Sequence, residues 1–135
     1  MKNMTEEHEK LLLKDLSARL PYGVKLQISS WDDVNMEYVD KVDTLYSISS
    51  DNHVRTSSED QDFYIDEVKP YLFPISSMNE RLREEHKDLL DNDGYTLDAN
   101  GNVFTLQDFY CKYHLDYRGF IPLGLAVDAT GLGIY

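Results

Sequence analysis

The sequence predicts a single α+β domain spanning residues 1–135, and three patterns lead to this prediction. Leucines recur at helical spacing near the N-terminus, whereas residues 24–28 alternate between apolar and polar as a half-buried strand does. Further on, Asn100-Gly101 is the preferred turn of a two-residue β-hairpin and lies between apolar residues. We therefore expect an N-terminal helix, an antiparallel β-meander that is open or curled into a small barrel, two further helices and a β-hairpin.

The N-terminal helix is expected to begin after Thr5, a good capping residue, and to end at Leu20, just before Pro21. Glutamates in its first turn suit the positive end of the helix dipole. Its polar residues, Asp15 among them, are expected to stay in water. The side expected to face the core is formed by Leu12, Leu13, Leu16 and Leu20.

The predicted meander comprises strands at residues 24–28, 43–50, 53–56 and 63–65. Asp51-Asn52 is expected to turn the chain between the second and third strands, because both residue types tolerate left-handed backbone conformations. Pro70 and Pro74 then bracket residues 71–73. Since proline lacks a backbone N–H, the sequence predicts neither a regular helix nor a central strand there.

A second helix is expected from Ser77, which forms a capping-box pattern with Glu80, to about Asp91. Its apolar side is thin, so the helix is expected to cover one edge of the domain. That side comprises Met78, Leu82, Leu89 and Leu90, with His86 beside them.

The predicted hairpin leads into the third helix. A two-residue turn at Asn100-Gly101 pairs Ala99 with Asn102, Leu97 with Phe104 and Tyr95 with Leu106. Thr105 and Asp108 are typical of a helix start, and Gly119 is expected to end this helix. Its predicted apolar stripe is Leu106, Phe109, Tyr110, Tyr113 and Tyr117. The glycine-rich remainder is expected to be irregular or a short strand.

Charge is the most informative property of the composition. The chain has 25 acidic and 13 basic residues and a net charge of −12, and the segment from Leu26 to Val68 carries nine of these net negative charges. Direct binding to a nucleic-acid backbone is disfavoured, because that interaction needs Lys and Arg. The single Cys111 excludes a disulfide within the chain. The acidic N-terminus and the lack of a long apolar run predict a cytoplasmic protein that does not bind or span a membrane.

Aromatic residues are interspersed with these acids, and this mixture predicts a surface that contacts a protein partner, one of basic character on charge grounds. Mimicry of a nucleic-acid backbone is the sharpest version of the hypothesis. The aromatic residues of the segment are Trp31, Tyr38, Tyr46, Phe63 and Tyr64. The residues predicted to bind the partner are Trp31, Asp32, Asp33, Asp60 and Asp62.

Motifs for chemistry are weak, so we predict no metal and no cofactor. The acidic loops that begin at Asp91 and Asp98 lack the sixth-position Gly and twelfth-position Glu of an EF-hand. Cys111 and His114 lie three residues apart, as two metal ligands or a nucleophile and its base could on one helix. The alternative to a binding protein is therefore a small hydrolase or metal-dependent enzyme that uses these two residues with nearby carboxylates.

Several segments resemble an uncharacterised family of small acidic proteins from gut Bacteroides-type bacteria and their phages or mobile elements. They are residues 71–78 (YLFPISSM), 114–119 (HLDYRG), 124–126 (GLA) and 20–24 (LPYGV), together with the leucine-rich first helix. The resemblance implies an intracellular accessory protein of a phage or mobile element and carries over no catalytic residue. Arg118 in the second segment is expected to form a structural salt bridge with Asp116 or with a distant carboxylate.

Overall fold

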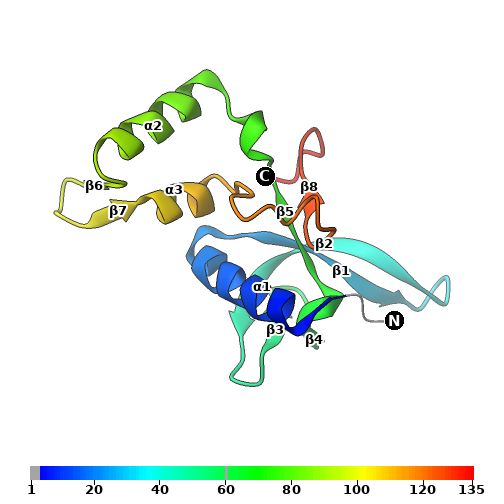
Figure 1. Ribbon diagram of the computed structural model, residues 1–135. Helices are drawn as coiled ribbons and strands as arrows, with labels where there is room; N and C mark the ends of the chain where they lie inside the picture. The colour runs from blue at the N-terminus through cyan, green and yellow to red at the C-terminus, as the bar shows by residue number, and fades with distance from the viewer. Residues whose placement is uncertain (1–3, 60) are drawn as a thin grey trace.

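The computed structural model describes residues 4–59 and 61–135, and the fold is α+β, as predicted (Figure 1). A six-stranded sheet has the strand order β4-β3-β2-β1-β5-β8, and the β6–β7 hairpin forms a separate two-stranded sheet. The large sheet therefore ends at β4 and β8 and does not close into a barrel. The helices are α1 (Glu6–Arg19), α2 (Glu80–Asp91) and α3 (Leu106–Lys112). The strands are β1 (Lys25–Asp32), β2 (Glu37–Ile48), β3 (His53–Thr56), β4 (Asp62–Tyr64), β5 (Lys69–Leu72), β6 (Tyr95–Leu97), β7 (Val103–Thr105) and β8 (Val127–Asp128).

Helix α1 confirms the predicted N-terminal helix. The Thr5 hydroxyl accepts a hydrogen bond from the backbone N–H of His8, and Leu12 and Leu16 are fully buried in the main core. The prediction that Asp15 stays in water is wrong, because this carboxylate is 0% exposed. It pairs with a buried arginine one turn later on the same helix, and a charge can be buried when it is paired in this way.

The β1–β2 hairpin is longer than predicted. The two strands pair antiparallel from Lys25 opposite Thr44 to Asp32 opposite Glu37, and the hairpin projects from the rest of the molecule (Figure 1). The turn predicted at Asp51-Asn52 is confirmed, with Asn52 in the left-handed region at a φ of 63°. Strands β3 and β4 follow it and complete the predicted antiparallel meander.

Strand β5 corrects the prediction for residues 71–73, because it lies inside the sheet between β1 and β8. Pro70 pairs with Leu26 of β1, whereas parallel pairing to β8 begins only at Tyr71. Pro70 therefore has one neighbouring strand, as a proline on an edge strand does. The short β8 confirms the expectation for the glycine-rich C-terminal segment.

Helix α2 begins two residues later than its predicted cap. The N-cap is Asn79, whose side chain accepts a hydrogen bond from the Leu82 N–H at 2.9 Å, whereas the Ser77 hydroxyl donates to the carbonyl of Pro74. Leu89 is buried, but Leu90 is exposed and does not belong to the apolar side.

The β6–β7 hairpin has a register that differs by one residue from the prediction. Tyr95 lies opposite Thr105 and Leu97 opposite Val103, so the loop is longer than two residues. The Asp98 carboxylate accepts hydrogen bonds from the N–H groups of two loop residues, both at 2.8 Å, and this side-chain bonding favours the longer loop. Because of the shift, Phe104 lies on the opposite face from Leu97.

Helix α3 begins as predicted, with a capping box between Thr105 and Asp108, but it ends at Lys112. Tyr117 therefore does not extend the aromatic stripe along the helix, and Gly119 does not end it. Tyr117 instead stacks on Tyr110 with ring centroids 4.7 Å apart.

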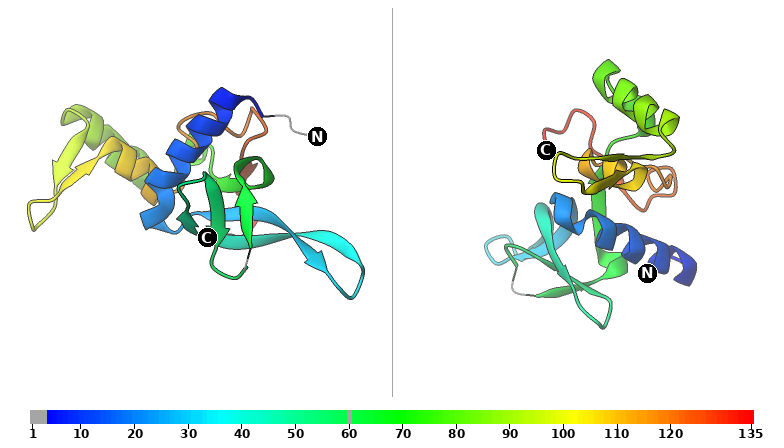
Figure 2. Two further views of the ribbon diagram at one scale, coloured as in Figure 1. Left: turned by 90° about the horizontal axis from the view of Figure 1, so that it is seen from below. Right: turned by 90° about the vertical axis from the view of Figure 1, so that its left-hand side faces the viewer.

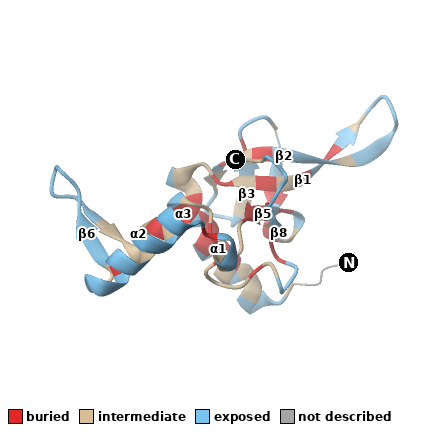
Figure 3. Ribbon diagram, turned by 90° about the horizontal axis from the view of Figure 1, so that it is seen from above, coloured by how far each residue is buried: buried red, intermediate tan, exposed pale blue. Residues whose placement is uncertain are grey.

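Two hydrophobic clusters hold these elements together (Figure 3). The main cluster lies between α1 and the large sheet and includes Leu16, Ile28 and Val54. The second cluster lies among α2, the β6–β7 hairpin and α3, and Phe109 is fully buried in it. Figure 2 shows the second group of elements at the end of the molecule opposite the projecting β1–β2 hairpin.

Candidate functional site

The far part of the β1–β2 hairpin, residues 28–42, has no second neighbouring strand, and we refer to it as the arm. Strand β5 pairs with β1 only at Leu26 and Gln27, and β3 joins β2 only from Leu45 onward. Both long edges of the arm are therefore unpaired by other strands of the described chain. Such edges are the parts of a sheet to which another chain can add.

Trp31 and Tyr38 form an aromatic pair on the arm. They are directly opposite each other in the two strands, and their rings meet edge to face with centroids 5.1 Å apart. Trp31 is 45% exposed and Tyr38 is 69% exposed, so the pair lies at the surface. Because side chains alternate along a strand, Asp40 and the exposed Val42 share this face with Tyr38.

The acidic residues of the arm have different roles. The Asp32 carboxylate accepts hydrogen bonds from the Val34 N–H at 2.9 Å and the Asn35 side-chain amide at 2.8 Å. These bonds, the one from the Asn35 side chain first, lower the pKa of Asp32. Asp32 therefore holds the turn at the tip of the arm. Asp33 lies within this turn and is exposed.

The remaining exposed acids of the arm are Glu37 and Asp40, on β2. The arm has a single basic residue, Lys41, whose ammonium lies 4.0 Å from the carboxylate of Glu59. Asp40 lies on the same face as the Trp31–Tyr38 pair, whereas Glu37 lies on the opposite face of the arm. Exposed acids therefore lie on both faces and at the tip of the arm, and Trp31 and Asp33, both predicted from the sequence, are among its exposed residues.

Asp62 lies close to the base of the arm. It borders a hollow of about 350 Å³ together with Ser29, Tyr38 and Glu67. Its carboxylate also lies 3.3 Å from the Arg55 guanidinium, so part of its charge is neutralised. The structure thus brings Asp62 to Tyr38, as a shared surface requires. Asp60, the last predicted binding residue, lies outside the described residues.

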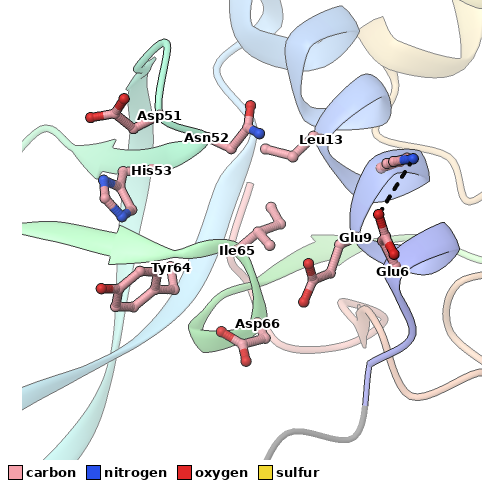
Figure 4. Close-up of a pocket in the computed structure, with 10 residues that line it drawn as sticks. Glu6, Glu9, Leu13, Asp51, Asn52, His53, Tyr64, Ile65 and Asp66 are labelled. Atoms are coloured by element: carbon pink, nitrogen blue, oxygen red, sulfur yellow. Dashed lines mark ion pairs between the residues drawn. The ribbon is translucent and has the colours of Figure 1, made fainter.

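A second acidic hollow was not anticipated from the sequence. It measures about 500 Å³ and lies between the start of α1 and the β3–β4 hairpin (Figure 4). His53 and Tyr64 line it with rings packed edge to face at 4.7 Å. The acids that line it are Glu6, Glu9, Asp51 and Asp66. Among the residues that the structure describes, no group of three or more His, Cys, Asp or Glu is arranged to hold a metal ion.

Cys111 and His114 do not form a reactive pair. Burial raises the pKa of Cys111 to about 11, which keeps the thiol protonated and unreactive at neutral pH. The prediction that both residues lie on one helix is wrong, because α3 ends at Lys112 and His114 lies beyond it at a φ of 56°. Its ring stacks on Tyr135 at 3.7 Å, and burial lowers its pKa to about 4.

Arg118 forms the expected structural salt bridge with a distant carboxylate. Its Nε donates to one oxygen of Asp15 at 3.0 Å, and the Nε of Arg19 donates to the other oxygen at 2.7 Å. The sequence pattern does not indicate which distant carboxylate Arg118 contacts. The Arg19 guanidinium also donates to the backbone carbonyl of Leu115, so the cluster joins α1 to the C-terminal segment.

The chain matches no protein-family model, and no curated protein and no solved structure is significantly similar to it. No helix in the described part of the chain combines the length and the apolar character needed to cross a membrane. The arm and its neighbouring hollows are therefore the features from which we infer a function.

Proposed function

We propose that this chain is a non-enzymatic accessory protein that binds a basic region of another protein through the arm. The observation that carries the proposal is the exposed Trp31–Tyr38 pair, which lies on a projecting hairpin among carboxylates with little compensating positive charge. Exposed aromatic side chains supply contact area when a partner covers them, and Trp and Tyr are enriched among the residues that dominate binding energies. The carboxylates attract a partner of opposite charge.

The resemblance to proteins of gut Bacteroides-type bacteria and their phages supports an intracellular role in a phage or mobile element, and this context is part of the proposal. The alternative of an enzyme that uses Cys111 and His114 gains no support from these two side chains. Burial raises the pKa of the thiol to about 11 and lowers the pKa of the imidazole to about 4. At neutral pH the thiol keeps its proton, and it is buried besides.

The test is affinity capture from a lysate of the source cell with four forms of the protein. The forms are wild type, Trp31→Ala with Tyr38→Ala, Asp33→Lys with Asp40→Lys, and the control Glu84→Lys with Asp91→Lys. The control makes the same charge change at exposed residues of α2, far along the chain from the arm. Asp32 is left intact, because it holds the turn of the arm.

We expect both arm variants to lose the same captured protein and the α2 control to retain it, with equal circular dichroism for all four forms. The captured protein should have a basic surface, and raised salt should weaken its retention, because exposed charges are screened. The proposal is wrong if the arm variants capture the same proteins in the same amounts as wild type.

A further inference from the structure

We propose that the free edge of β1 in the arm takes an extended, lysine- or arginine-rich segment of the partner as an added strand. This inference rests on the proposed function and specifies the chemistry of the partner and its mode of binding. The added strand would lie along residues 28–32, in line with β5, which leaves β1 after Gln27. It would continue the sheet where the protein's own strand stops.

No strand of the described chain pairs with this edge of β1 beyond Gln27. Beyond Gln27 the chain of β5 departs from β1, because the preceding residues Ile65–Glu67 form a turn of 3-10 helix. The hollow of about 350 Å³ is lined by Ser29 of β1 and by Glu67. The side chains of Ile28 and Ser30 are buried, so an added strand would meet the backbone of β1 beside the exposed Ser29 and Trp31. Space for a few residues of a second chain therefore lies beside β1.

The side chains around this edge include carboxylates and aromatic rings. Asp62 and Glu67 border the hollow, and Tyr38 borders it next to the ring of Trp31. A lysine or arginine of an added strand would meet a carboxylate in the hollow and could place its charge over an aromatic ring. Because side chains of a strand alternate, basic residues at every second position would all lie toward this acidic surface.

Charge also argues against the other occupants of a free edge. A second copy of this chain would bring Asp33, Glu37 and Asp40 of one arm toward acids of the other, within a molecule of net charge −12. Like charges placed together oppose association. A nucleic acid would be repelled for the same reason, although the exposed rings could stack on bases. An extended basic peptide is the occupant that satisfies both the rings and the carboxylates.

The test uses Trp31, which is the only tryptophan of the chain and so reports on the arm by its fluorescence. The first probe is a peptide of about eight residues that alternates Lys and Thr, long enough to span residues 28–32 at roughly 3.3 Å per residue. Two further peptides carry N-methyl groups on alternate backbone nitrogens, one for each edge of the peptide strand. A helical peptide with the same number of lysines is the fourth probe.

We expect the unmodified peptide to change the fluorescence of Trp31 and one methylated peptide to bind about tenfold more weakly, because several backbone hydrogen bonds are lost. The other methylated peptide should keep its affinity, since its methyl groups point away from β1. Tyr38→Ala should weaken binding about two- to fivefold, the size of one exposed cation–π contact. The Glu84→Lys, Asp91→Lys control should bind like wild type.

Each of the following results would overturn the inference. Equal binding of both methylated peptides, or equal binding of the helical peptide, would show that charge alone drives the interaction; the proposed function would survive, but strand addition would not. A single-stranded oligonucleotide that changes the Trp31 signal, or dimers that depend on the arm, would identify another occupant. If the unmodified peptide does not bind, the inference is wrong, and the capture experiment then decides the proposed function separately.

Discussion

Asp15 is the residue whose replacement tests the structure most severely. Its two carboxylate oxygens accept from Arg19 at 2.7 Å and from Arg118 at 3.0 Å, and both Asp15 and Arg19 are 0% exposed. In Asp15→Asn the side chain keeps its size but loses its charge, and one of the two oxygens becomes an amide group that cannot accept a hydrogen bond. A buried arginine is then left without its counter-ion.

Removal of one partner from a buried ion pair costs about 3–5 kcal/mol. Arg118 is 16% exposed and can keep part of its hydration, whereas Arg19 cannot, so we expect a loss near the lower end, about 3 kcal/mol. For a chain of 135 residues this corresponds to a decrease in Tm of roughly 10–15 °C. The effect is large because it removes a sizeable part of the total stability of a domain of this size, which is about 5–15 kcal/mol.

The assay is urea and thermal unfolding followed by far-ultraviolet circular dichroism, since the only tryptophan lies on the arm and reports poorly on α1. The matched control is Glu6→Gln, which breaks the exposed Lys10–Glu6 pair at 3.6 Å and is expected to cost less than about 1 kcal/mol. If Asp15→Asn destabilises the protein no more than Glu6→Gln, the buried charge cluster is not what joins α1 to the C-terminal segment.

Two further predictions concern the buried titratable groups near the end of α3. Burial lowers the pKa of His114 from 6.5 to about 4, so between these values the unfolded chain binds a proton that the folded chain does not, and stability should fall as the pH drops through this range. In His114→Asn, where asparagine tolerates the positive φ, the unfolding free energy should change less with pH in this range. An unchanged slope would show that His114 does not cause the pH dependence. Burial raises the pKa of Cys111 to about 11, so a disulfide reagent at pH 8 should label the thiol only after denaturant is added, and rapid labelling of the folded protein would contradict its burial.

Local signals in the sequence predicted two of the three helix starts and the turn at Asp51-Asn52. Thr5 caps α1 and Thr105 forms a capping box with Asp108, because capping depends on residues within one turn of each other. Asn52 adopts the expected left-handed conformation for the same local reason. Where two local signals competed, the prediction was wrong: Asn79 rather than Ser77 caps α2, and the Asp98 carboxylate shifts the register of the β6–β7 hairpin by one residue.

Features set by tertiary contacts could not be predicted from the sequence. Pro70 occupies an internal strand because β8 pairs with β5 only beyond it, and that strand comes from the far end of the chain. Asp15 looked like a solvated residue of α1. Its pairing with Arg19 four residues on does not reveal that the pair is buried, and its second partner, Arg118, lies more than one hundred residues away. The arm was missed in part because residues 37–42 of β2 are exposed or half-buried throughout and lack the alternation that a buried face imposes.

The carboxylates of the acidic segment between Leu26 and Val68 have different roles in the structure. Asp43 is buried and accepts hydrogen bonds from Ser57 and Ser58, and Asp32 holds the tip of the arm, so these carboxylates stabilise the fold. In the function proposed above, the exposed acids of the arm and the Trp31–Tyr38 pair contact the partner. A partner should therefore respond to reversal of Asp33 and Asp40 through lost binding, whereas reversal of Asp32 or Asp43 should act first through lost stability. Comparison of these two pairs of variants separates the binding role of the acidic segment from its structural role.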